Sequence, residues 1–258
     1  MAENNIEETY YSWEAELEKE YNRIFFDAQY TIFDGIISPR DYFNSPIKVL
    51  FLNREAYDED ECSYMIHHAL RKQIEKGDPI FNNTYWINQN MKERLAFCSL
   101  LERVTDWQDD EAIEYAQNMN DNEYRSLLLK SAYCNIKKSD GVNGSSKNNL
   151  LEYAQKGWSI IEKQICFFNP TLIIGGNVID DIIECVDGLT WGEELYVGIE
   201  TKGTIYHIQF GGKFYPIIDL YHPSYTVHSE DLYYALKQSA QNHPGYWEKR
   251  IGQNCFDL

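Results

Sequence analysis

The chain has 258 residues, of which 43% are hydrophobic and 25% are charged, and its formal net charge is −18. These values are typical of one large soluble domain with a full core. No run approaches the roughly 18 apolar residues of a membrane-crossing helix, and the acidic N-terminus lacks the basic-then-apolar order of a signal peptide. We therefore expect a cytoplasmic protein without a membrane partner.

The six cysteines include no C-x-x-C pair. Zinc and iron–sulfur sites therefore find no support in their spacing, and reduced, partly buried thiols are expected instead. We expect no metal and no cofactor.

The strongly acidic charge is unusual for a nucleic-acid-binding protein, because such proteins usually present a basic face to the phosphates. The acidic residues gather in the first 20 residues and between 106 and 123. Such blocks are typical of solvated helix faces, and they leave room for a basic groove elsewhere.

Hydrophobic spacing predicts alternating helices and strands along the chain. We expect strands, in chain order, at 47–52, 131–138, 171–174 and in a hairpin at 195–220. We expect helices at 6–29, 60–76, 89–104, 109–130, 148–168 and 178–185, and a last one from Ser229. The order predicts a three-layer α/β/α sandwich around a central, mostly parallel four-stranded sheet. We expect a single domain over 1–258, with 1–44 as an N-terminal helical extension.

The last strand of this pattern runs into Asp219-Leu220-Tyr221-His222-Pro223-Ser224. Ligands of open α/β sheets bind at the carboxyl ends of the strands, and the proline fixes the backbone directly after His222. Histidine is suited to hydrogen-bond a leaving group near neutral pH. A histidine that only caps a turn is the alternative.

Four segments resemble, in the same order, the uracil-DNA glycosylase superfamily. They are Glu55-Ala56 after the first strand, Ala132 to Lys138 in the second strand, Ile165 to Gly176, and His222-Pro223-Ser224. The resemblance covers about residues 45–240. It implies that His222 donates a hydrogen bond to the departing base, that Asn135 reads the Watson–Crick edge of a flipped base, and that Glu55 polarises water or opposes the positive sugar.

Other site residues are candidates for contacts with the base or with DNA. An aromatic side chain should stack on the base, and the candidates are Tyr57, Tyr64 and Phe81. Phosphate could be held by Ser224, Lys137 and Lys138. Each candidate also has an ordinary structural interpretation. The aromatic residues could belong to the core, and the Asn135 side chain could be satisfied by neighbouring backbone at the end of the sheet. Glu55 could form a salt bridge with Arg54, and the lysines could lie in a solvated loop.

The chain departs from the family's pattern in the first loop. Arg54 stands where the family has glycine, Tyr57 where it has proline, and Ala56 where the uracil-specific branch has a water-activating aspartate. The paired N-terminal cysteines of the thermophile branch are missing. The altered loop indicates a differently shaped pocket.

The resemblance implies a DNA glycosylase with DNA as its partner, acting on uracil or on a modified pyrimidine, with phage DNA as one source. The alternative is a catalytically inactive protein of the same fold that binds a nucleotide, a nucleic acid or a protein. A third hypothesis is a hydrolase of free nucleosides or nucleotides.

Overall fold

The computed structural model describes residues 3–26, 28–55, 63–77, 89–139, 146–183, 186–197, 201–210, 212–221, 230–245 and 247–251. Six strands form its main sheet: β2 (Val49–Glu55), β4 (Ser131–Lys137), β5 (Leu172–Gly176), β6 (Leu189–Val197), β7 (Thr201–Phe210) and β8 (Lys213–Leu220). Their spatial order is β4-β2-β5-β8-β7-β6. The fold is therefore α/β with a mixed sheet.

Four neighbouring strands of this sheet run parallel, because β2 pairs in parallel with β4 and β5, and β5 pairs in parallel with β8. The remaining two strands, β7 and β6, are antiparallel additions beyond β8. The expected hairpin at 195–220 is thus part of a three-stranded meander that begins at Leu189. A register shift between Trp191 and Glu194 interrupts the alternation of β6 and explains why its first half gave no strand pattern.

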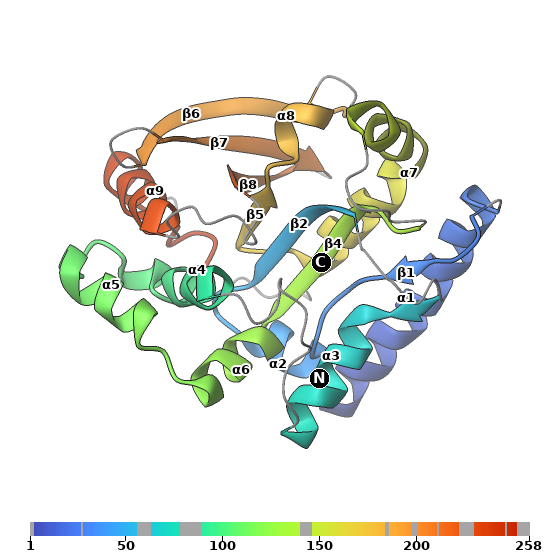
Figure 1. Ribbon diagram of the computed structural model, residues 1–258, viewed down its shortest axis with the longest axis horizontal. Helices are drawn as coiled ribbons and strands as arrows, with labels where there is room; N and C mark the ends of the chain where they lie inside the picture. The colour runs from blue at the N-terminus through green and yellow to red at the C-terminus, as the bar shows by residue number, and fades with distance from the viewer. Residues whose placement is uncertain are drawn as a thin grey trace.

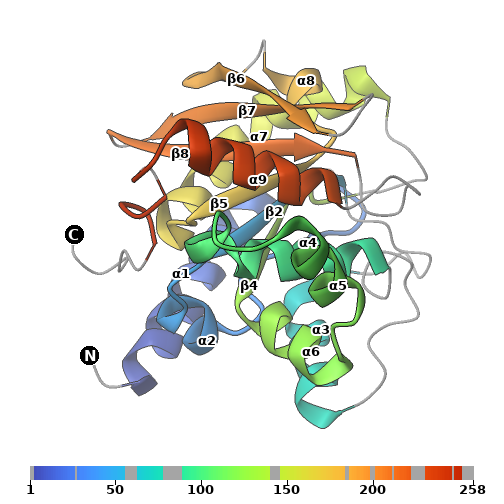
Figure 2. The same cartoon turned by 90° about the vertical axis from the view of Figure 1, so that its left-hand side faces the viewer.

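Helices cover both faces of the sheet (Figures 1 and 2). The described helices are α1 (Glu3–Ile24), α2 (Pro39–Asn44), α3 (Ile66–Lys76), α4 (Gln89–Ser99), α5 (Asp109–Gln117), α6 (Asp121–Leu129), α7 (Lys147–Phe168), α8 (Ile179–Ile182) and α9 (Glu230–Asn242), with a 3₁₀ turn at Leu101–Arg103. None of these described helices combines the length and apolar character that a bilayer crossing requires.

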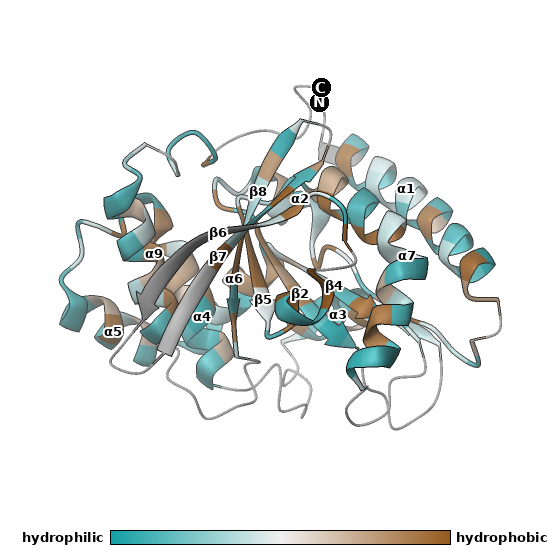
Figure 3. Cartoon of the chain, turned by 90° about the horizontal axis from the view of Figure 1, so that it is seen from above, coloured by the Kyte–Doolittle hydropathy of each residue, from teal (hydrophilic) through white to brown (hydrophobic). Residues whose placement is uncertain are grey.

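Two hydrophobic cores flank the sheet, because successive side chains of a strand point to opposite faces. In β2, Val49 and Phe51 pack with α4, α5, α6 and α9 on one side. Leu50 and Leu52 pack with residues of α1, α2, α7 and α8 on the other. Figure 3 shows the hydrophobic strands between these two groups of helices. Every residue of β2 through Leu52 is therefore apolar, which is the pattern that identified it as a buried strand.

Capping explains where two helices begin. The expected helix at 109–130 is two helices, because the Asn120 side chain accepts a hydrogen bond from the Glu123 N–H at 3.0 Å and starts α6. α2 begins after Ser38, which is its N-cap, and has Pro39 in its first turn.

The outer edge of β4 is covered by an N-terminal segment. The Tyr133 N–H donates to the Gly35 carbonyl at 2.9 Å, and Ile36 forms an isolated antiparallel bridge with Ala132. A small parallel sheet of β1 (Ile32–Phe33) and β3 (Tyr64–Met65) lies beside the end of this strand. An edge strand without such cover would offer a row of unpaired backbone groups.

Candidate functional site at the carboxyl edge of the sheet

The four parallel strands deliver polar residues to one edge of the sheet. Asn53 of β2 lies directly opposite Asn135 of β4, and Glu55 lies opposite Lys137. Asp219 of β8 lies opposite Gly175 of β5 at the same edge. Since neighbouring strands lie about 4.8 Å apart, this row spans about 14 Å from β4 to β8. β8 ends two residues before His222.

Asn135, a sequence-predicted site residue, is held through its backbone. Its backbone N–H donates to Asp34 Oδ2 at 2.7 Å, and its carbonyl accepts from Lys138 Nζ at 3.0 Å. The residue is 7% exposed. Its backbone is therefore held from both sides near the carboxyl end of β4.

Asp34 and Lys138 form the centre of this clamp. Lys138 Nζ and Asp34 Oδ1 are 2.5 Å apart, and both side chains are fully buried. Gln164 of α7 completes the network, because its Nε2 donates to Asp34 Oδ1 at 3.1 Å. The interpretation of Lys138 as a phosphate contact is therefore corrected, since its ammonium group lies in the interior.

Lys137 is also drawn inward. Its Nζ donates to Asn149 Oδ1 at 3.0 Å and lies 4.9 Å from the ring centroid of Tyr153, both on α7. The residue is 4% exposed. From the sequence, the two adjacent lysines were candidates for phosphate contact, with a solvated loop as the alternative. The long helix α7 covers one of them and the segment around Asp34 covers the other, so neither extends toward solvent as a phosphate ligand would.

Glu55 and Tyr64 occupy different surroundings. Glu55 is the last residue of β2 and is half-buried. Its neighbour Arg54 forms an ion pair with Asp181 of α8. Tyr64 belongs to the small β1–β3 sheet and packs against Tyr30.

Tyr57, Phe81, His222 and Ser224 lie outside the described residues. Their predicted roles in base stacking, base release and phosphate contact stay predictions.

Asp219 is a polar residue of this edge to which the sequence reasoning gave no role. Its carboxylate accepts backbone N–H groups of Val178 and Ile179, the latter at 2.9 Å. Burial raises its pKa to about 6, against the effect of these backbone donors. Gly175 makes room for it, because a Cβ there would collide with the Asp219 carboxylate. In the sequence, the run Gly175-Gly176-Asn177 before a short helix was the feature that could have indicated a close approach of another residue at this position.

Arg94 is a second residue without a sequence-based role. It is buried on α4, and its guanidinium donates a hydrogen bond to the Tyr221 carbonyl. Tyr221 immediately precedes His222, so Arg94 anchors the chain where it leaves β8.

A cavity of about 120 Å³ lies at the opposite edge. Its lining is mostly apolar and includes Ile47 and Val49 at the start of β2, with Leu95 of α4. It therefore does not belong to the row that contains Asn135.

Comparisons with known proteins identify no relative of this chain. No family model matches it, and neither a curated protein nor a solved structure matches it. The function is therefore argued from the residues and their geometry.

Proposed function

We propose that this chain is a DNA glycosylase of the uracil-DNA glycosylase type, with the three-layer α/β/α fold and single domain of that superfamily. It flips a base out of DNA and hydrolyses the N-glycosidic bond. One observation carries the proposal: Asn135 stands, with its backbone clamped, at the carboxyl edge of the parallel strands of which β8 leads to His222. The collinear order of the four resembling segments supports it.

The chemistry requires recognition of the base and stabilisation of the charge that develops. Breaking the bond leaves positive charge on the sugar and negative charge on the base. The Asn135 amide offers one acceptor and two donors to the edge of an extruded base. A hydrogen bond from His222 stabilises the base anion, and the Glu55 carboxylate opposes the sugar cation or orients water. The fixed backbone at Asn135 favours recognition of the base, since preorganised groups need no rearrangement during the reaction.

The substrate in this proposal is a deaminated or modified pyrimidine, with phage DNA as one source. The ion pair between Arg54 and Asp181 supports a modified base. It holds a long side chain against α8 at a position where the family has a small residue.

A catalytically inactive protein that binds a nucleotide, a nucleic acid or a protein is the second candidate. Two observations favour it: the net charge of −18, and the burial of the Lys137 and Lys138 side chains. Both reduce the electrostatic attraction of this surface for a DNA backbone.

Base release separates the two candidates. The protein is incubated with single-stranded and duplex DNA containing uracil, hypoxanthine, hydroxymethylated cytosine or glucosylated cytosine, and abasic sites are revealed by alkaline strand cleavage. We expect release from one pyrimidine substrate, lost in His222→Ala and retained in the exposed control Asn118→Ala. Binding without release from any of these DNAs supports the inactive candidate, and full activity of His222→Ala contradicts the role given to that residue.

A further inference from the structure

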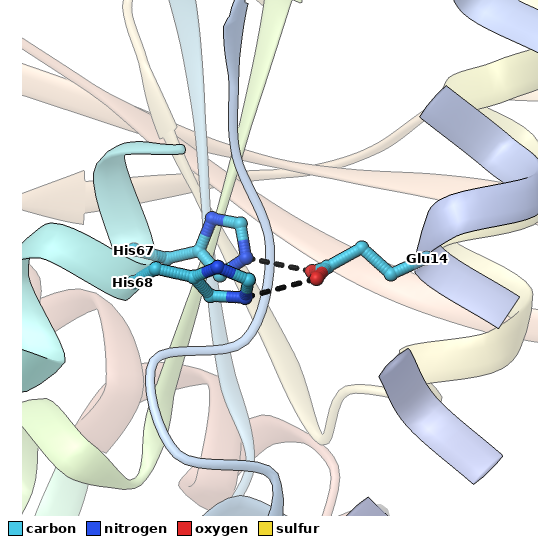
Figure 4. Close-up of side chains that lie close together, drawn as sticks. All are labelled: Glu14, His67 and His68. Carbon is cyan, nitrogen blue, oxygen red and sulfur yellow. Dashed lines mark hydrogen bonds and ion pairs between the residues drawn. The ribbon is translucent and has the colours of Figure 1, made fainter. Parts of the chain in front are cut away.

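Three potential metal ligands meet between two helices, outside the row of strand ends. Glu14 projects from α1, and His67 and His68 project from the first turn of α3 (Figure 4). Both imidazole rings point toward the one carboxylate. His67 is fully buried and Glu14 is 3% exposed, whereas the His68 side chain is 40% exposed. The cluster therefore has an interior side and a solvent-facing side.

The distances among the donor atoms are those of groups that face a common centre. His67 Nε2 lies 2.6 Å from Glu14 Oε1, and His68 Nε2 lies 2.9 Å from Glu14 Oε2. One donor atom from each of the three residues can be chosen so that all lie within 4.8 Å of one another. Two ligands about 2.05 Å from a zinc ion and about 90–110° apart are separated by about 2.9–3.4 Å. Small side-chain movements would therefore admit a cation.

Both imidazoles direct Nε2 at the Glu14 carboxylate, so a cation would take the place of the proton in each of these contacts. His68 Nε2 is buried and lies 2.9 Å from Glu14 Oε2, its ion-pair partner. Glu14 forms its ion pairs with the two histidines, and within the described chain no lysine or arginine pairs with it. A divalent cation would satisfy the nitrogen lone pairs and the carboxylate charge together.

Surrounding groups fix the carboxylate in place. The Tyr10 hydroxyl donates to Glu14 Oε1 at 2.5 Å and accepts from the Ile36 N–H at 2.8 Å. Gly35 passes directly over the cluster, where a Cβ would lie 3.0 Å from Glu14 Oε1 and 3.1 Å from His67 Nε2. Outer-shell hydrogen bonds of this kind orient metal ligands.

We propose that Glu14, His67 and His68 bind one divalent transition-metal ion, that Zn²⁺ matches the donor set best, and that the ion fastens α1 to α3. Two imidazoles and one carboxylate with a further position open are a known ligand set for zinc. The exposed side of His68 leaves that position to water. This inference is independent of the glycosylase proposal and departs from the expectation of no metal, which rested on cysteine spacing.

The test measures zinc on the full chain. After equilibrium dialysis against Zn²⁺, we expect one bound ion per chain in the wild type and in the control variant His243→Ala, whose histidine is exposed. His68→Ala should weaken binding by more than about 100-fold, and Tyr10→Phe by about 10–100-fold, the range for loss of an outer-shell partner. Zinc should raise the unfolding temperature of the wild type and leave that of His68→Ala unchanged.

His68→Ala keeps the test decisive, because its partly exposed ring can be removed without opening the core, and circular dichroism checks that the variant is folded. The proposal is overturned if the folded wild type retains no more zinc than His68→Ala. It is equally overturned if His243→Ala loses the ion.

Discussion

The ammonium group of Lys138 lies 2.5 Å from the carboxylate of Asp34, and neither side chain reaches solvent. The pair does not stand alone, since the same carboxylate accepts the backbone N–H of Asn135. Lys138 in turn donates to the Asn135 carbonyl. The charged group of Lys138, directly after the end of β4, thus fixes the backbone of Asn135.

Removing one partner of this pair should be costly. Lys138→Ala leaves a buried carboxylate without its cation, and we expect a loss of about 3–5 kcal/mol in the free energy of unfolding. Urea denaturation measures it. Lys156→Ala, which breaks the exposed pair with Glu152, is the matched control and should change stability by less than about 1 kcal/mol. Equal effects of the two substitutions would contradict the burial of Lys138.

Asn135→Asp tests recognition of the base once a substrate is known. The substitution keeps the size of the side chain but replaces its N–H donors with a carboxylate oxygen. We expect kcat/KM to fall about 10–100-fold, because loss of a paired contact to a base edge costs about 1–3 kcal/mol. Single-turnover base release measures the change, and an unaltered rate would exclude Asn135 from the base-binding site.

Asp219 should make stability depend on pH. Its folded pKa of about 6 lies above the unfolded value near 3.8. Between these values the unfolded chain releases the proton first, so stability falls as pH rises from about 4 to 6 and loses at most about 3 kcal/mol from this group. Urea midpoints at pH 4.5 and pH 7 measure the fall. Asp219→Asn, which is isosteric and does not titrate, should show a smaller fall, and identical profiles would rule out a raised pKa.

Two cysteines should resist alkylation in the folded protein. Burial raises the pKa of Cys98 and of Cys134 to about 12, and the thiolate is the reactive form. Iodoacetamide at pH 8 followed by peptide mass spectrometry should leave both unmodified, whereas the same treatment in urea modifies them. Modification of either one without denaturant would show that its surroundings open.

The elements that the sequence predicted well carry strong local patterns. The expected strands at 47–52 and 131–138 overlap β2 and β4, because buried parallel strands are apolar on both faces. The expected helix at 148–168 matches α7, which Ser146 caps through the Asn149 N–H and which Asn169-Pro170 follows.

Other features depend on contacts between distant parts of the chain. The pairing of Ile32 with Tyr64 forms a strand of two residues on each side, too short to give a periodic signal. The burial of Lys138 depends on Asp34, 104 residues earlier. The cluster of Glu14 with the adjacent His67 and His68 joins separate helices, so no local spacing could have announced it.

The cover over β4 has a consequence for shortened forms of the protein. In residues 35–37, the Gly35 carbonyl accepts the outward N–H of Tyr133, and the Ile37 N–H donates to the outward carbonyl of Ser131. A chain trimmed to remove the N-terminal 44 residues would present that row of donors and acceptors bare to any second molecule. Such a truncated chain should self-associate or precipitate through edge-to-edge strand pairing. The N-terminal segment therefore protects the edge of β4 from aggregation in addition to packing against the core.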